Sequence, residues 1–319
     1  MKVRLGIDLG GTSIKIGVVD EKYRIVYKQS IPTDADSKSF SEIVKNMALA
    51  AQAAAEAAGY DIKDFPCVGI GSPSYINPHT GLLVFFNNTN WRNVPLRQEL
   101  QKYIPVPVFI GNDANCAVVG EALAGSAKGY DNVLMLTLGT GIGSGLIING
   151  KLYCGADGMG AELGHTTFVY GGEACTCGRK GCYESYASVS ALIRQTKDAM
   201  RSAPDSLMHG VSEEQGNKVT GRTAFDAAKM GDEAALRVVD RYIDYVASGI
   251  SGFVNIFRPD IVLIGGGISS EGDYLLKPLN EKTLRCVLAG DIIGAPPVIA
   301  AKLGNDAGII GAAYQDMML

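Results

Sequence analysis

The chain has 319 residues, of which 47% are hydrophobic and 19% are charged, and its 29 basic and 33 acidic residues leave a net charge of −4. This length and composition predict one large domain or two domains with a sizeable core. The slightly acidic balance argues against a general nucleic-acid binder and against a protein of basic membrane surfaces. No apolar run reaches about 18 residues and no signal sequence is visible, so the sequence predicts a cytoplasmic protein without a membrane span.

The first part of the chain is typical of a layered α/β domain. Residues 3–20 read as two strands joined by a Gly-Gly turn, and residues 23–31 alternate like a third strand. Residues 39–59 predict a helix that Ser39 or Ser41 caps and Gly59 ends. Two further strands follow near residues 65–74 and 106–112, and the second leads directly into a helix. Three strands in succession, then strands alternating with helices, indicate an α/β layer.

The second part repeats the opening pattern. Residues 132–153 again read as strand, glycine turn and strand, which indicates an internal duplication. Long helices are predicted over 189–202 and 233–257, and a strand near 260–264. Residues 203–221 are polar and aperiodic, so they are expected to form a surface insertion. The predicted domains are residues 1–120 and 121–302, with a last helix, about 303–319, packing back on the first domain.

Two glycine turns are candidate phosphate-binding loops. Glycines permit positive φ and let backbone N–H groups approach an anion. An ordinary hairpin turn has the same pattern, but its recurrence in both halves favours a clamp for a polyphosphate. Neither turn has the GK[ST] of a Walker A loop or leads into a helix, as a dinucleotide fingerprint would. The candidate residues are Asp8 as a water-mediated Mg²⁺ ligand, Gly10, Gly11, Thr12 and Lys15 in the first turn, and Gly139, Thr140 and Gly141 in the second.

Two strand ends carry further candidates. Gly265, Gly266 and Gly267 follow an apolar strand, where a loop without side chains suits a flat base; a plain strand-to-helix turn explains them equally well. Asp113 follows another strand, where one fixed carboxylate can remove a proton from a sugar hydroxyl, and Asn112 beside it can both donate and accept. Alternatively, Asp113 or Asn115 only caps the helix.

Four side chains with metal-ligand chemistry are gathered between residues 165 and 182. They are His165, Cys175, Cys177 and Cys182, which match the four N or S ligands of a tetrahedral structural zinc site. Redox thiols or scattered buried cysteines are the alternatives. Glu162 and Glu184 flank the set, and carboxylates with an imidazole are good partners for a polyol. Because the glycine turns are distant in sequence, loss of the metal is expected to leave nucleotide binding intact.

The motifs DLGGT, NDAN, LGTGIG, AELGH and CTCGRKGCYE together resemble those of the ROK family of sugar kinases, most closely its bacterial glucokinases. The resemblance covers nearly the whole chain. It implies the two-domain actin-like ATPase fold of ribonuclease H type, with a duplicated βαβ-containing core. It also implies ATP-dependent phosphorylation of a hexose, most often glucose to glucose 6-phosphate, with Mg²⁺ and a structural Zn²⁺ as cofactors and a homo-oligomer, a dimer or tetramer, as the assembly.

The resemblance further implies roles for particular residues. Asp113 would be the general base, and the glycine turns with Asp8, Thr12 and Lys15 would surround the nucleotide and Mg²⁺, with the Gly265–Gly267 turn near the adenosine. The zinc ligands would be the four residues given above. Sugar hydroxyls would be bound by Asn87, Asn112, Asp113, Glu162, His165 and Glu184.

Other members of the family leave alternatives to glucose open. These are kinases for mannose, fructose, allose, N-acetylmannosamine or N-acetylglucosamine, and non-catalytic sugar-sensing proteins. Two departures from the glucokinase pattern bear on the sugar: Ser74 stands where glycine is usual, and Thr89 lies in NNTNW where NLPGW is familiar. A helix-turn-helix, as in repressors of the family, is not expected, because the first strand is predicted from residue 3.

Overall fold

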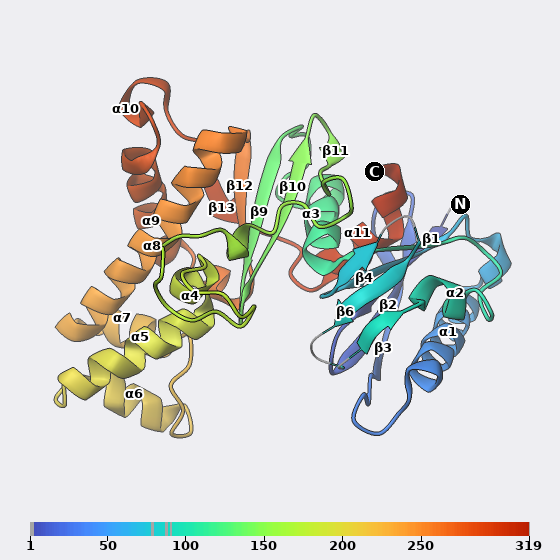
Figure 1. Ribbon diagram of the computed structural model, residues 1–319, viewed down its shortest axis with the longest axis horizontal. Coiled ribbons are helices and arrows are strands. Elements are labelled where there is room, and N and C mark those ends of the chain that lie inside the picture. The colour runs from blue at the N-terminus through green and yellow to red at the C-terminus, as the bar shows by residue number, and fades with distance from the viewer. Residues whose placement is uncertain (1–2, 78–79, 87–88, 90, 319) are drawn as a thin grey trace. The chain divides into compact units, whose positions relative to one another are not determined.

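The computed structural model describes residues 3–77, 80–86, 89 and 91–318, and the chain forms two compact units (Figure 1). The first unit comprises Met1–Met135, Gly145–Ala161 and Ala301–Leu319, and the second comprises Leu136–Ser144 and Glu162–Ala300. Each unit is a set of segments that contact one another more than they contact the rest of the chain. Because such units need not coincide with domains, the predicted domain limits at residues 120 and 302 remain a prediction. Among the described residues, none of the helices combines the length and the hydrophobicity that a membrane span needs.

The first unit is built on a five-stranded sheet in the order β3-β2-β1-β4-β8. Its strands are β1 (Val3–Leu9), β2 (Ser13–Asp20), β3 (Ile25–Pro32), β4 (Val68–Ser72) and β8 (Val108–Asn112). The pairs β1–β2 and β2–β3 are antiparallel, and the pairs β1–β4 and β4–β8 are parallel. The hairpin strands predicted from residues 3–31 are therefore present, and the parallel strands follow the helical crossovers.

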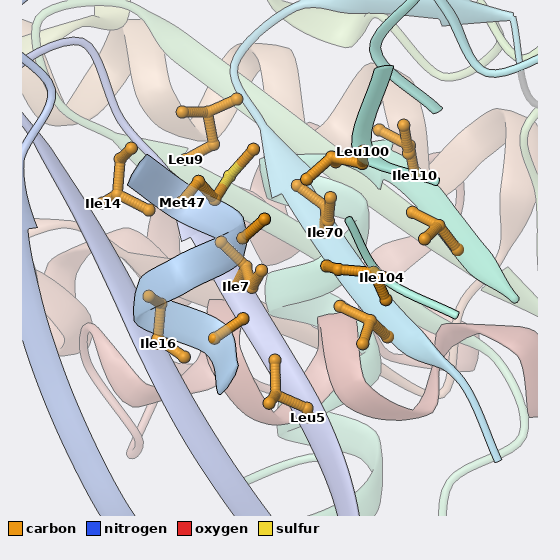
Figure 2. Close-up of a cluster of buried hydrophobic side chains, with 14 of the residues drawn as sticks. Leu5, Ile7, Leu9, Ile14, Ile16, Met47, Ile70, Leu100, Ile104 and Ile110 are labelled. Atoms are coloured by element: carbon orange, nitrogen blue, oxygen red, sulfur yellow. The ribbon is translucent and has the colours of Figure 1, made fainter. Parts of the chain in front are cut away.

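One face of this sheet is covered by α1 (Phe40–Ala57). The helix begins as expected at Ser39, whose hydroxyl accepts from the Glu42 N–H while the Glu42 carboxylate accepts from the Ser39 N–H, a capping box. Successive side chains of a strand point to opposite faces, so alternate residues of β1 reach this helix. Figure 2 shows Met47 of α1 beside Leu9 and Ile7 of β1 and Ile14 of β2.

The opposite face is covered by α11 (Asp306–Tyr314), which also packs against α3 (Asp113–Ala124). Backbone meets backbone here, because glycines face the helix: a Cβ added at Gly6 or Gly69 would overlap carbonyl groups of α11. Likewise, a Cβ added at Gly311 would overlap the carbonyl of Cys116 in α3. The helix from the end of the chain is thus held close to the first strand of the chain.

Small elements complete the first unit. The strands β5 (Tyr75–Asn77), β6 (Leu82–Phe86) and β7 (Trp91–Val94) form an antiparallel sheet of their own. The helix α2 (Leu96–Leu100) follows this sheet, and the 3₁₀ helices η1 (Ile62–Asp64) and η5 (Gln315–Met317) lie in the same unit.

The second five-stranded sheet has the order β11-β10-β9-β12-β13. Its strands are β9 (Val133–Leu138), β10 (Ile142–Ile148), β11 (Lys151–Leu152), β12 (Ile261–Gly265) and β13 (Val298–Ala300). Ranked along the chain, this is again third, second, first, fourth, fifth, the order of the first sheet. The predicted duplication, and with it the actin-like fold of ribonuclease H type, is confirmed.

Helices make up most of the second unit. They are α4 (Glu184–Ala187), α5 (Val189–Ser202), α6 (Met208–Glu214), α7 (Thr223–Lys229), α8 (Glu233–Phe257), α9 (Asp273–Cys286) and α10 (Gly290–Ile293), with 3₁₀ helices η3 (Leu163–His165) and η4 (Gly267–Glu271). The prediction that residues 203–221 form a surface insertion without regular structure was wrong, since α6 forms there and buries Met208 and Val211. A helix of two turns is too short to show a clear period in a polar stretch.

Candidate active site

The carboxyl ends of three adjacent parallel strands gather polar residues in the first unit. Asp8 of β1 is in register with Gly71 of β4, and Ser72 of β4 is in register with Asn112 of β8. Asp113 follows directly as the first residue of α3. In α/β sheets, ligands bind outside the carboxyl ends of the strands. The fold therefore brings Asp8, Asn112 and Asp113 to the sheet edge at which a ligand is expected.

Asn112, and not Asp113, caps α3. Its Oδ1 accepts from the backbone N–H of Ala114 at 2.8 Å and from that of Asn115 at 3.3 Å. Asp113 lies inside the helix, where its Oδ1 accepts from Ala114 N–H at 2.9 Å. The capping function that the sequence offered to Asp113 or Asn115 is thus carried out by their neighbour.

The Asp113 carboxyl lies in an environment that disfavours its charge. Burial raises its pKa to about 6, the Ala114 N–H acts in the opposite direction, and the nearby negative charge of Asp8 raises the pKa further. A carboxyl with a pKa near 6 is mostly ionised at neutral pH and holds a proton more readily than an ordinary aspartate. That combination suits a group that accepts a proton during a reaction.

The first glycine turn joins β1 to β2 next to Asp8. Lys15 Nζ lies 2.9 Å from Asp8 Oδ2, and Gly10 N–H donates to the Ser13 carbonyl at 3.0 Å. Gly10 and Gly11 do not adopt positive φ, so the part of the expectation that concerned positive φ was wrong. At Gly10 the reason is space, because a Cβ would lie 2.9 Å from the Ser13 oxygen. Thr12 accepts the Thr33 N–H at its carbonyl, which holds the turn to the end of β3.

Ser74, one of the two residues that depart from the glucokinase pattern, lies near the same edge. Ser74 follows β4 and donates from its hydroxyl to the Ser72 hydroxyl at 3.0 Å, and both side chains are buried. Because Ser72 is in register with Asn112, this hydroxyl pair belongs to the edge that carries Asp113. Asn87 lies outside the described residues.

The second unit contains a cavity of about 510 Å³ beside its glycine turn. It brings together Gly139 and Thr140, between β9 and β10, and Gly267, after β12. Three predicted residues do not line it: Gly141, Gly265 and Gly266. Gly266 has φ +89°, and a Cβ there would overlap the Leu138 carbonyl, so this glycine allows close packing of the loop beside the cavity.

Several residues of the cavity were not anticipated. Gln215 and Thr220 come from the stretch expected to be a surface insertion, and Gln215 Oε1 accepts from the hydroxyls of Thr220 and Thr223, both at 2.7 Å. Such a network fixes the amide in one orientation. A short polar stretch gives no periodic signal, so the sequence offered no means of finding them. The unanticipated lining residues are Leu138, Val189, Gln215, Thr220, Gly221, Arg222, Ile268 and Glu271.

The second unit also gathers the four predicted metal ligands. One ligand atom each from His165, Cys175, Cys177 and Cys182 lie within 4.8 Å of one another. The Cys177 and Cys182 sulfurs are 3.6 Å apart, and Cys175 Sγ is 3.7 Å from His165 Nδ1. A sulfur separation of 3.6 Å excludes a disulfide, whose bond is about 2.05 Å. Ligands around a tetrahedral zinc at about 2.3 Å lie roughly 3.5–3.8 Å apart, so both separations fit that metal.

The backbone of residues 166–182, the metal-ligand loop, explains this gathering. Gly178 and Gly181 have φ of +86° and +80°, a conformation that favours glycine, and a Cβ at Gly181 would overlap the Val169 carbonyl. Arg179 Nη2 donates to the His165 carbonyl at 2.6 Å, which ties the loop to η3.

The predicted sugar-binding residues of the second unit lie on both sides of this loop. Glu162 immediately precedes η3, and His165 ends η3 with Nδ1 facing Cys175. Glu184 begins α4, and its Oε2 accepts from the Ile142 N–H at 2.8 Å while its Oε1 accepts from Thr176 Oγ1 at 3.1 Å. The contact from Glu184 to β10 was not anticipated from the sequence.

Known proteins are similar to this chain over almost its full length. Residues 4–315 match the ROK family. A glucokinase from Thermotoga maritima is 39% identical, over 97% of this chain and 95% of the relative. An N-acetyl-D-glucosamine kinase from Pasteurella multocida is 29% identical, over 98% of each. The crystal structure of a ROK family glucokinase from Streptomyces griseus in complex with glucose and AMPPNP is 34% identical, with a TM-score of 0.82 over 99% of both chains.

Proposed function

Because the chain belongs to the ROK family, we propose that it is an ATP-dependent kinase that phosphorylates a hexose, with glucose as the preferred acceptor and the hydroxyl on carbon 6 as the point of transfer. The observation that carries this proposal is Asp113, a carboxyl with a pKa near 6 at the carboxyl ends of three parallel strands. Phosphoryl transfer needs a positioned base and stabilised phosphates more than covalent chemistry.

On the acceptor side, Asp113 takes the proton of the sugar hydroxyl as the hydroxyl attacks. The cap of α3 engages only Oδ1 of Asn112, so its Nδ2 is the group proposed to donate to sugar. Because Nδ1 of His165 faces the cysteines, its Nε2 is the nitrogen proposed for sugar. The proposed sugar-binding residues are Asn87, Asn112, Asp113, Glu162, His165 and Glu184.

On the donor side, the two glycine turns are proposed to hold the nucleotide. Bound Mg²⁺ would neutralise charge on the phosphates. The cavity of the second unit has the size of a small-molecule site, and its mostly apolar wall suits a base. The proposed nucleotide residues are Asp8, Gly10, Gly11, Thr12, Lys15, Gly139, Thr140, Gly141, Gly265, Gly266 and Gly267.

Zinc is the metal proposed for His165, Cys175, Cys177 and Cys182, and the three thiols with one imidazole form a closed set of four ligands. A closed site leaves no position for substrate, so its contribution would be to hold the metal-ligand loop in shape. Unoxidised thiols of this kind fit a reducing compartment, which supports a cytoplasmic location. A homo-oligomer of two or four chains also remains part of the proposal.

The test is an ADP-release assay of the purified protein over glucose, mannose, fructose, allose, N-acetylglucosamine and N-acetylmannosamine. Glucose is expected to have the highest kcat/KM. Asp113→Asn should lower kcat by about 10²–10⁴, the scale of a positioned acid–base group. The exposed Asp36→Asn is the matched control and should act as wild type.

The same assay separates the alternatives. A higher kcat/KM for N-acetylglucosamine would assign the chain the activity of its Pasteurella relative, and the Ser72–Ser74 hydroxyl pair would then be the first place to look for the cause. Binding of AMPPNP and sugar without ADP release from any sugar would indicate a non-catalytic sensor.

A further inference from the structure

Glu184 joins two parts of the second unit that are far apart in sequence. One carboxylate oxygen, Oε2, accepts from the backbone N–H of Ile142 at 2.8 Å. The other, Oε1, accepts from Thr176 Oγ1 at 3.1 Å and lies 3.6 Å from Cys175 Sγ. A single side chain therefore spans from the metal-ligand loop to the first residue of β10.

The Ile142 end of this bridge is the second glycine turn. Within the turn, Gly139 N–H donates to the Gly141 carbonyl at 3.0 Å, and the Gly139 carbonyl accepts from Val189 N–H at 2.9 Å. A Cβ added at Gly141 would overlap Glu184 Oε2. A side chain at 141 would thus displace the carboxylate packed against the turn, which gives a reason for glycine at a turn residue that does not line the cavity of the second unit.

The other end of the bridge depends on the metal-ligand loop. Thr176 lies between Cys175 and Cys177, both members of the four-ligand cluster. The backbone that places the Thr176 hydroxyl is consequently fixed by the same residues that gather the cluster. Glu184 itself follows Cys182 by two residues, so the cluster sets both the position of the carboxylate and that of its hydroxyl donor.

We propose that Glu184 is a positioning residue for the nucleotide: it fixes the glycine turn at residues 139–141 through the Ile142 N–H, and so makes nucleotide binding depend on the metal-ligand loop. This inference rests on the proposed function, in which that turn holds the nucleotide. It differs from the sequence expectation that loss of the metal leaves nucleotide binding intact.

The substitution Glu184→Gln separates this role from sugar binding. The carbonyl of the new side chain can still accept from the Ile142 N–H, and its amide can donate to the Thr176 hydroxyl, which has lone pairs to accept. The negative charge available to sugar hydroxyls is lost. Glu184→Gln should therefore keep the turn in place while the KM for glucose rises, whereas Glu184→Ala loses both functions.

The experiment is calorimetry of AMPPNP binding without sugar. Glu184→Ala is expected to raise the Kd about 10–100-fold, the scale of a lost hydrogen bond to a charged group. Glu184→Gln should leave the Kd equal to that of wild type. The matched control is Glu173→Ala, which removes an exposed carboxylate of the neighbouring segment and should leave the Kd unchanged.

A second variant covers the case in which Glu184→Ala does not fold. Thr176→Val removes the hydroxyl that donates to Glu184 and that lies outside the glycine turn. The Kd for AMPPNP should rise about threefold, because the loss can reach the turn only through the Glu184 carboxylate. An AMPPNP Kd equal to wild type in the folded Glu184→Ala variant, or in Thr176→Val where Glu184→Ala is unfolded, overturns the inference. Failure of the wild-type protein to bind AMPPNP would instead overturn the proposed function.

Discussion

At the scale of single residues, the environment of Asp113 sets the pH range in which the proposed reaction runs. Burial, and after it the charge of Asp8, raise the pKa of this carboxyl to about 6, against a partial opposing effect of the Ala114 N–H. A base must be unprotonated to act. The environment that positions the carboxyl therefore also removes it from use in acid.

The first prediction is a pH profile with one acidic limb. The value of kcat/KM for glucose should rise about tenfold per pH unit below pH 6 and be flat from about pH 7 upward, because this ratio reports the ionisation of the free enzyme. Steady-state rates between pH 4.5 and 8.5 provide the measurement. An acidic limb with its midpoint near pH 4 would mean that the group is an ordinary exposed carboxylate.

The second prediction concerns stability. Because the folded state raises the pKa of Asp113, it binds this proton more tightly than the unfolded chain, and its stability falls as pH rises from about 4 to 6. Asp113→Asn removes the charge whose burial lowers the stability of the folded state above pH 6. The variant should be more stable than wild type by about 1–2 kcal/mol at pH 8. This is less than the roughly 3 kcal/mol that a rise of about two pKa units implies, because Asp113 is only half-buried and solvent screens part of the effect. Urea unfolding at pH 8 and pH 5 measures it, and the gain should shrink at pH 5.

At the scale of elements, α11 is held by contacts that only glycine allows. The third prediction compares two Gly→Ala changes within helices. Gly311→Ala should destabilise the protein by about 2–4 kcal/mol, since the new Cβ overlaps the Cys116 carbonyl. Gly252→Ala in α8 should instead stabilise it by up to about 1 kcal/mol, because nothing lies within 4 Å of that Cβ and alanine favours helix.

Thermal unfolding of both variants checks this pair. Equal effects of the two changes would show that helix propensity, and not the close approach of α11 to α3, decides the outcome at residue 311.

Most elements could be predicted because their signals are local. Strand alternation, the Ser39 cap and the repeated glycine turn are all read within about 20 residues, and the gathering of His165 with three nearby cysteines is local too. What could not be predicted depends on distance in space. The Glu184–Ile142 hydrogen bond joins residues 42 apart, and Gln215 acquires its place in the cavity from a short helix without a clear period.

At the scale of the whole molecule, the metal-ligand loop supports the proposed sugar and nucleotide residues of the second unit together. The fourth prediction is that purified protein carries about one zinc per chain, and that Cys177→Ser loses the metal, raises the KM for sugar at least about tenfold and weakens AMPPNP binding. Loss of a group that only orients a metal ligand commonly costs about 10–100-fold in metal affinity or activity, so loss of a ligand itself should cost at least as much. Metal analysis and calorimetry on one preparation provide the measurements.

The matched control is Cys286→Ser, since Cys286 is an exposed cysteine on α9, outside the cluster. It should retain zinc and both affinities. Full activity in protein shown to contain no zinc would rule out a structural zinc site.

The first unit takes its residues from both ends of the chain, and this has a consequence for synthesis. Strand β1 begins at Val3, while α11, which covers its other face, ends at Tyr314. At roughly 5–20 residues per second, translation separates the two by on the order of 15–60 s. The second unit needs nothing beyond residue 300, whereas the first unit is complete only with α11. The unit that is started first is therefore finished last, and protease treatment of a released chain truncated after residue 300 should find the second unit resistant while Gly6 and Gly69 still lack their helix.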